Sequence, residues 1–322
     1  MSRRGAAAEP TVAAAFRQCV ARLRGARLHY GHGTHDAHDE AAFFILHVLA
    51  LAPQSLAPLA GTRLSRRQTA RLRSLIDRRI RTKAPAAYLL REAWLGPLRF
   101  YVDRRVIVPR SFIAELLRAG LAPWVRRPVR RLLDLCTGCG CLAIVAAHVF
   151  PRARIDASDN SQPALAVARR NLALHRLEHR VRLVQSDLLA ALEGRRYDLI
   201  VCNPPYVDAP SMRRLPAEYR YEPRRALAGG RDGLDVVRRI LEQAPRHLMP
   251  NGVLVCEIGH NRAALERAYP RTPFLWPETS AGPDHVFVLG RADFPPITPG
   301  ASVSPARATR ARGRRSVHPR AR

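Results

Sequence analysis

The chain has 322 residues, of which 47% are hydrophobic, and it carries a formal net charge of +28 at pH 7. This length and composition predict one large α/β domain with a smaller partner and exclude a small disulfide scaffold. The longest apolar stretch, residues 41–51, is interrupted by His47 and is too short to span a bilayer. No sustained apolar segment follows Arg3 and Arg4, as a secretory signal would require, so we expect a cytoplasmic protein.

The positive charge is almost entirely arginine, because Lys83 is the only lysine, and it is spread along the chain. A basic surface of this size favours polyanionic surroundings such as RNA or ribosomal particles, through phosphate contacts that carry no sequence information. For any single cluster, a solvated arginine face that helps solubility is an equally good interpretation.

Three of the six cysteines form the pattern Cys136-x-x-Cys139-x-Cys141. No second pair of Cys or His follows at zinc-finger spacing to complete four ligands. We therefore predict no metal site, and we interpret these cysteines as small residues packed where a strand meets a helix.

The first 83 residues are expected to form a small helical domain, because apolar side chains recur at helical spacing between residues 11 and 83. A helix is expected to begin between Thr34 and Asp39, where short polar side chains can cap it. Residues 84–110 contain short alternating apolar pieces, at 98–102 and 106–108, separated by Asp103-Arg104-Arg105. This pattern predicts a β-hairpin that links two domains.

Residues 111–290 alternate between strand and helix patterns after a helix that follows Ser111, which predicts a doubly wound α/β domain with a mostly parallel sheet. The expected strands are 131–136, 154–157, 181–185, 197–202, 253–258 and 286–289. The expected helices are 141–150, 162–175, 234–248 and 261–269. Residues 291–322, rich in Pro, Ser, Ala and Arg, are predicted to be a disordered basic tail.

A glycine turn follows the first strand of this domain, in the segment Asp134-Leu135-Cys136-Thr137-Gly138-Cys139-Gly140. In an open α/β sheet, ligands lie outside the carboxyl ends of the strands, and glycine leaves the backbone open to a ligand. Asp134 closes the strand, where its carboxylate could orient the turn or a bound ammonium group. Gly138 and Gly140 are not followed by the third glycine of a dinucleotide-binding motif, which argues against NAD. The sequence also lacks the Gly-x-x-x-x-Gly-Lys-Ser/Thr motif of a phosphate-binding loop.

Two further acids stand at the ends of the next two strands. Asp159 is placed to accept both hydroxyls of a ribose. Asp187 is placed to meet an adenine amino group, while Leu188 packs on the ring. Each acid alone is often only a solvated residue at a strand end, but three in succession favour S-adenosylmethionine as the ligand.

Asn203-Pro204-Pro205-Tyr206 comes directly after the strand at 197–202. An amide nitrogen is a poor nucleophile, so an enzyme that methylates it must hold the –NH2 group by both hydrogens and turn its lone pair toward the methyl donor. The Asn203 side-chain oxygen and the Pro204 carbonyl can accept these hydrogens, and Tyr206 offers a flat face. Alone, Asn-Pro-Pro is also a common turn, an alternative that the adenosine-site pattern upstream weakens.

These motifs resemble the class I S-adenosylmethionine-dependent methyltransferases, whose sheet has seven strands. Over about residues 30–290 the chain most closely resembles the protein-glutamine methyltransferases that modify ribosomal proteins and peptide release factors. The supporting segments are Gly31-His32-Gly33-Thr34 with Asp39-Glu40, Ala87-Tyr88-Leu89-Leu90, Val106-Ile107-Val108-Pro109-Arg110-Ser111, Tyr221-Glu222-Pro223, Gly230-Arg231-Asp232-Gly233-Leu234 and Glu257-Ile258-Gly259.

The resemblance implies that the helical domain binds the substrate and that Asn203, Pro204, Pro205 and Tyr206 carry the catalysis. It implies cofactor contacts from Asp134, Thr137, Gly138, Gly140, Asp159, Asp187, Leu188 and Asn203. It also implies that Arg110 and Glu222 form a wall of the substrate pocket.

One spacing favours the branch that modifies the third large-subunit ribosomal protein. Release-factor enzymes resemble Pro-Arg-Pro-x-Thr-Glu, whereas here Glu115 follows Arg110 one position later. Departures from the family pattern are Cys139 in place of Ser, Trp94 in place of Phe, and the basic tail. The alternatives are a release-factor glutamine methyltransferase, an adenine-amino methyltransferase that stacks a flipped base on Tyr206, and a non-catalytic RNA-binding protein.

Overall fold

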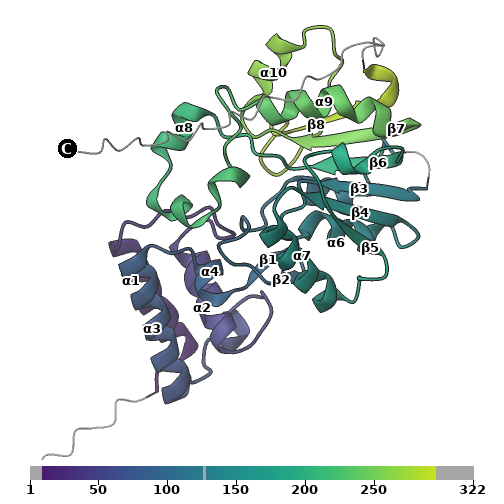
Figure 1. Ribbon diagram of the computed structural model, residues 1–322. Helices are drawn as coiled ribbons and strands as arrows, with labels where there is room; N and C mark the ends of the chain where they lie inside the picture. The colour runs from purple at the N-terminus through teal and green to yellow at the C-terminus, as the bar shows by residue number, and fades with distance from the viewer. Residues whose placement is uncertain (1–8, 126–127, 295–322) are drawn as a thin grey trace, which may run out of the picture.

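The structure, a computed structural model, describes residues 9–125 and 128–294. A bundle of helices at the N-terminal end stands beside a larger domain built on a sheet (Figure 1). Most of the predicted basic tail lies outside the described residues. Its first residues differ from the prediction: Arg291–Asp293 form the turn η5, and Phe294 is buried in the core of the sheet domain because its ring packs among apolar side chains there.

The N-terminal bundle contains α1 (Val12–Gly25), α2 (Ala37–Val48), α3 (Arg66–Thr82), the short α4 (Ala86–Leu90) and the turn η1 (Ala57–Leu59). Asp36 caps α2 by accepting from the backbone N–H groups of His38 and Asp39, within the window predicted for this helix start. Ser65 and Gln68 form a capping box at the start of α3. The helices enclose an apolar core of their own, to which α4 adds Ala86 and Leu90.

The predicted hairpin lies between the two parts, but with different strands. It pairs β1 (Ala93–Leu95) with β2 (Leu98–Phe100) around a turn at Gly96, which has φ +58°. Residues 106–108 are not a strand, because the backbone N–H of Val108 donates to Glu222, 3.1 Å away, instead of joining a ladder. The turn at Asp103 is present and is closed by its bonds to Arg105.

The sheet domain confirms the predicted doubly wound α/β fold. Its strands are β3 (Arg131–Leu135), β4 (Arg154–Asp159), β5 (Val181–Gln185), β6 (Tyr197–Cys202), β7 (Leu248–Glu257) and β8 (Val286–Gly290). They lie in the order β5-β4-β3-β6-β7-β8, with only β8 antiparallel.

This sheet has six strands within the described residues, not the seven that the family resemblance implied. Beside β8, where another strand could pair, there is a single bridge between Leu275 and Val288. Pro273 and Pro277 flank Leu275, and because proline has no N–H to donate, they keep this segment from extending into a strand.

Helices cover both faces of the sheet (Figure 1). One face packs against α5 (Ile113–Arg118), α6 (Cys141–Val149) and α7 (Gln162–His175), and the other against α9 (Asp235–His247) and α10 (Arg262–Ala268). A short turn, η2 (Ala190–Leu192), follows β5. Among the described helices, none combines the length and the apolar character that crossing a membrane requires.

The segment between β6 and α9, residues 203–234, positions the site. It contains α8 (Ala209–Arg214), η3 (Ala217–Tyr221) and η4 (Arg224–Ala226). It leaves the carboxyl end of the sheet and reaches across to the helical bundle (Figure 1). We call it the β6–α9 segment below.

Candidate active site

Asp134, at the end of β3, is 1% exposed and stabilises the glycine turn by hydrogen bonds. Its Oδ2 accepts from the Thr137 hydroxyl at 2.5 Å and from the backbone N–H of Ala143 at 2.9 Å, which ties the turn to the start of α6. Its Oδ1 is buried and has no hydrogen-bond partner among the described residues. Burial raises the pKa of Asp134 to about 7, because the charged form loses its hydration.

The two predicted glycines serve different purposes. Gly138 has φ +56°, and a Cβ built on it would meet nothing within 4 Å, so its backbone is open to a ligand. A Cβ on Gly140 would stand 3.3 Å from the Cβ of Ala168, so Gly140 lets α7 pack closely. Asp134, Thr137 and Gly140 thus shape the turn, and only Gly138 of these predicted cofactor residues lines the cleft beside it.

A cleft of about 860 Å³, including its open mouth, lies at the carboxyl ends of β3, β4, β5 and β6. It brings together six of the predicted residues: Gly138, Asp159, Asp187, Leu188, Asn203 and Pro205. Residues from four strand ends therefore meet in one place, as the pattern of acids and glycines predicts.

Asp159 and Asp187 differ in their surroundings. Asp159 accepts from the backbone N–H groups of Gly138 at 2.9 Å and Ser161 at 2.8 Å, one on each carboxylate oxygen. Burial raises its pKa, and each oxygen keeps a further lone pair for a hydroxyl donor. Asp187 is exposed and pairs with Arg239 at 2.8 Å, while its neighbour Leu188 is buried in the cleft wall with φ +50°.

The cleft has further lining residues that the sequence reading missed. They include Val106 and Ile107 from the linker, Ser158 and Ser186 from the strand ends, and Arg225 and Arg239 from the covering elements. The Ser158 hydroxyl is buried without a hydrogen-bond partner in the described part of the chain. Val106 and Ile107 could have been found, since they belong to a segment that resembles the family, whereas a serine at a strand end gives no signal of its own.

Tyr206 has close contacts at its backbone, its ring and its hydroxyl group. Its backbone carbonyl accepts from the Asn261 side chain at 2.8 Å, and its hydroxyl donates to Glu257 at 3.2 Å. A Cβ on Gly229 would stand 2.6 Å from its Cα, and one on Gly259 would stand 2.7 Å from its ring. Asn203 and Pro205 reach the cleft, whereas Pro204 is buried and Tyr206 packs behind them.

Glu257, at the end of β7, is a site residue that sequence reasoning missed. It is 1% exposed and accepts from the Ser111 hydroxyl at 2.6 Å and the Phe112 backbone N–H at 3.0 Å, besides Tyr206. Burial raises its pKa, and these three donors oppose the shift. The segment Glu257-Ile258-Gly259, which resembles the family, could have pointed to Glu257. In this segment Gly259 makes room for the Tyr206 ring.

Arg110 and Glu222 form an ion pair that is largely buried. Arg110 Nη2 lies 2.7 Å from Glu222 Oε2, and Nη1 contacts the other oxygen, so the pairing is bidentate. The Glu222 side chain is fully buried, while that of Arg110 is 25% exposed. Burial alone would raise the pKa of Glu222, but the Arg110 guanidinium outweighs it and lowers that pKa.

Neither Arg110 nor Glu222 lines the cleft itself. Arg110 stands 5.9 Å from the centre of the Tyr219 ring, and residues 108–112 bind both buried carboxylates, Glu222 and Glu257. We call the Arg110–Glu222 pair the acceptor wall, after the role that the resemblance implies for it. As for metal ligands, residues 9–125 and 128–294 contain no group of three His, Cys, Asp or Glu side chains that could hold an ion, and the six cysteines are free thiols.

Known proteins are similar to this chain over most of its length. A family model described as "Methyltransferase small domain" matches residues 116–215. The chain is 53% identical to the "Ribosomal protein uL3 glutamine methyltransferase" of Bordetella pertussis, over 86% of this chain and 93% of that relative. It is 52% identical to the protein of the same name from Neisseria meningitidis serogroup A, over 87% and 93%. A crystal structure of a methyltransferase from Pyrococcus furiosus is similar at 18% identity and a TM-score of 0.46, covering 69% of this chain and 98% of that one.

The relatives show that the protein is a methyltransferase, as the family model over residues 116–215 also indicates, which confirms the predicted class of enzyme. At more than half identity over most of both chains, the finer assignment also follows. The chain belongs to the family of the ribosomal protein uL3 glutamine methyltransferases, the branch that the Arg110 to Glu115 spacing favours.

Proposed function

We propose that the protein transfers a methyl group from S-adenosylmethionine to the side-chain amide nitrogen of a glutamine in ribosomal protein uL3. The observation that carries this proposal is the position of Asn203, which lines the same cleft as Gly138 and Asp159. An amide-holding group therefore stands next to a site suited to a nucleoside. The names of the relatives supply the substrate protein.

The residues of the cleft fit S-adenosylmethionine. Gly138 leaves room for the ligand, Asp159 has lone pairs for the ribose hydroxyls, and Asp187 and Leu188 would hold the adenine by a polar and an apolar contact. Asp134 is buried under the glycine turn, next to residues 135 and 136 of the cleft lining, and its unpaired Oδ1 would accept from the ammonium group of the methionine part. When bound, the cofactor supplies a methyl group on a positively charged sulfur.

On the acceptor side, Asn203 Oδ1 and the Pro204 carbonyl would accept the two amide hydrogens. This grip turns the nitrogen lone pair toward the methyl group and favours the pyramidal nitrogen of the transition state. Pro205 shapes the pocket, and Tyr206 keeps the turn in place through Glu257 and Asn261. A strong base is not needed, because the proton becomes acidic once the nitrogen carries the methyl group, so positioning does most of the work.

We also propose a function for each of the three parts of the chain. The N-terminal part, residues 1–83, would bind the substrate protein, residues 84–110 would link the two parts, and residues 111–290 would bind the cofactor and carry out the transfer. The net charge of +28 supports contact with ribosomal RNA or a ribosomal particle through phosphates. We place the reaction in the cytoplasm, where ribosomal proteins are made and assembled.

The test is to incubate the purified protein with S-adenosylmethionine carrying a labelled methyl group and with unmethylated uL3 or release factors, each in a separate reaction. We expect label on uL3, and fragmentation mass spectrometry should place it on a glutamine side chain. Label on the release factors alone would contradict the substrate, and label on adenine of added DNA or RNA would contradict the reaction. Raising the salt concentration in a binding assay with ribosomal particles should weaken the contact if phosphates contribute to it.

A further inference from the structure

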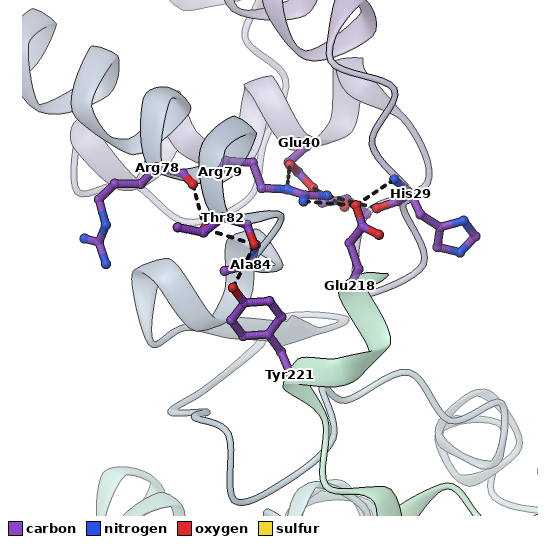
Figure 2. Close-up of polar contacts among 9 residues, drawn as sticks. His29, Glu40, Arg78, Arg79, Thr82, Ala84, Glu218 and Tyr221 are labelled. Carbon is purple, nitrogen blue, oxygen red and sulfur yellow. Dashed lines mark hydrogen bonds and ion pairs between the residues drawn. The ribbon is translucent and has the colours of Figure 1, made fainter. Parts of the chain in front are cut away.

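Arg79 is a charged side chain buried between the two parts of the molecule. It projects from α3 and is 1% exposed. Its Nε donates to Glu40 Oε1 at 2.5 Å, its Nη2 donates to the His29 carbonyl at 2.9 Å, and its Nη1 lies 3.5 Å from Glu218 Oε1 (Figure 2). A buried guanidinium with carboxylates on two sides is costly to form, and removing one partner is strongly destabilising.

Two of these partners lie on either side of one loop. His29 comes before Gly31-His32-Gly33-Thr34, and Glu40 comes after it, in the first turn of α2. Within it, the Gly31 N–H donates to the Thr34 carbonyl at 2.8 Å, and the Thr34 hydroxyl donates to Glu40 at 3.3 Å. Arg79 therefore fixes both ends of this loop at once.

The loop places His32 against the acceptor wall. His32 is 3% exposed, its ring centre lies 4.4 Å from that of Tyr219, and its Nε2 lies 3.8 Å from Glu222 Oε2. Burial lowers the pKa of His32 to about 4, with Glu222 opposing the shift, so the ring is neutral near pH 7. The same loop lines a groove formed with α2 and the hairpin, through His32, Gly33 and Thr34.

The third partner, Glu218, belongs to the β6–α9 segment. It sits in η3, shortly before Glu222, and its Oε1 also accepts from the His29 backbone N–H at 3.0 Å. Figure 2 shows Glu218 projecting from this segment toward Arg79 and His29 of the helical bundle. The cluster of Arg79, Glu40 and Glu218 thus joins the loop that carries His32 to the segment that carries Glu222.

We propose that Arg79 is a positioning residue for the substrate protein. By holding His29, the loop after it and the start of α2 against η3, it sets the outer wall of the acceptor site and the adjoining groove, on which the polypeptide around the target glutamine rests. His32 supports this reading, because it both lines the groove and faces the Arg110–Glu222 pair. The inference rests on the proposed function, and it adds the element that selects the protein substrate.

The main variant is Arg79→Lys in the full-length protein. Lysine keeps the positive charge between the two carboxylates, so the fold should survive, but it lacks the planar fork that reaches three partners. We expect KM for uL3 to rise by about fivefold or more, with kcat and the Kd for S-adenosylhomocysteine within about twofold of the wild type. Glu218→Gln, which keeps an acceptor for the His29 N–H, should raise KM in the same direction.

Tyr221→Phe is the matched control. Its hydroxyl donates to the Thr82 carbonyl at 2.7 Å, so this change also removes a contact between η3 and α3 but leaves the Arg79 cluster intact (Figure 2). KM for uL3 should stay within about twofold.

An unchanged KM in both Arg79→Lys and Glu218→Gln would overturn the inference. So would a loss of thermal stability in which kcat, KM and cofactor affinity all deteriorate together, because that is the signature of a structural role alone. A wild-type protein that leaves uL3 unmethylated would instead refute the proposed function, so the two failures are distinguishable.

Discussion

The cofactor side and the acceptor side of the site are built differently. On the cofactor side, Asp134, Thr137, Gly138 and Ala143 belong to one continuous strand, turn and helix, and their bonds are local. On the acceptor side, Arg110 meets Glu222 across 112 residues of sequence, and Ser111 meets Glu257 across 146. The first is a local motif, and the second is a set of buried charges assembled from distant segments.

This difference has consequences for what each half tolerates. Removing one partner of a buried, hydrogen-bonded carboxylate is strongly destabilising. Substitutions on the acceptor side should therefore lower the stability of the fold. On the cofactor side, the Gly138 backbone and the carboxylates of Asp159 and Asp187 line the cleft. Substitutions there should therefore change the affinity for the ligand. The following substitutions test that separation.

Asn203→Ala should have the largest effect, because it removes one of the two acceptors for the amide hydrogens. We expect methyl transfer to fall by about 100-fold or more, the scale seen when one transition-state hydrogen bond is lost. Affinity for S-adenosylhomocysteine, measured by calorimetry, should stay within a few-fold. Unaltered turnover in single-turnover assays would contradict the role of Asn203.

Glu222→Gln should mainly reduce stability, because it leaves the Arg110 charge without its partner. We expect the free energy of unfolding in urea to fall by about 2–3 kcal/mol. Since the pKa of Glu222 is lowered in the folded state, its contribution is present above the ordinary value of 4.5 and is lost as pH falls through the lowered pKa, so the variant should lose that part of the acid sensitivity.

The control for this change is Glu266→Gln, which breaks the exposed pair with Arg262 on α10. Its effect on the free energy of unfolding should be within about 0.5 kcal/mol, since exposed ion pairs contribute little. An equally small effect of Glu222→Gln would refute the account of the acceptor wall.

Cofactor binding should depend on pH through Asp134, whose pKa is raised to about 7 by burial. The ammonium group prefers the ionised carboxylate, so affinity should rise with pH through 7 and fall below it, by up to about tenfold per unit. Calorimetric titrations of S-adenosylhomocysteine between about pH 6 and 8 would measure this. In Asp134→Asn the slope should vanish, and a wild-type affinity that does not change with pH would contradict the assignment.

Gly138→Ala should have the smallest effect of these substitutions. We expect it to weaken cofactor binding in addition to lowering the stability of the fold. Alanine at φ +56° is strained by about 1 kcal/mol, and its methyl group would point into open space beside the cleft. Gly194→Ala is the control, because Gly194 has φ +72°, also has open space at its Cβ and lies before β6, away from the cleft. Equal losses of cofactor affinity in both variants would refute the role of Gly138.

The sequence predicted the locally built cofactor side better than the acceptor side, which is assembled from distant segments. The strands, the helices around the sheet and the acids at the strand ends were predictable, because periodicity and turn residues are local signals. Asp159, Asp187, Leu188 and Asn203 meet in the cleft as expected. Asp134, Thr137 and Gly140 lie outside the lining of the cleft, so their cofactor contacts stay predictions.

Arg110 and Glu222 were named through the family resemblance, but two other buried charges, Arg79 and Glu257, were not predicted. Among 54 Lys and Arg residues, nothing local distinguishes Arg79, which is buried only because Glu40 and Glu218 converge on it in the folded chain. Glu257 likewise acquires its role from Ser111, far away in sequence. The misplaced hairpin has the same cause, because Val108 gives its N–H to Glu222 instead of a neighbouring strand.

The central claim is that the cofactor and the amide of the target glutamine meet at Asn203. A crystal structure with S-adenosylhomocysteine and a uL3 peptide that contains the glutamine would test it most directly. The account predicts adenosine between Asp159 and Leu188, with the amide nitrogen within about 3.2 Å of both Asn203 Oδ1 and the Pro204 carbonyl oxygen. Adenosine bound elsewhere, or an Asn203 side chain turned away from the amide, would contradict it.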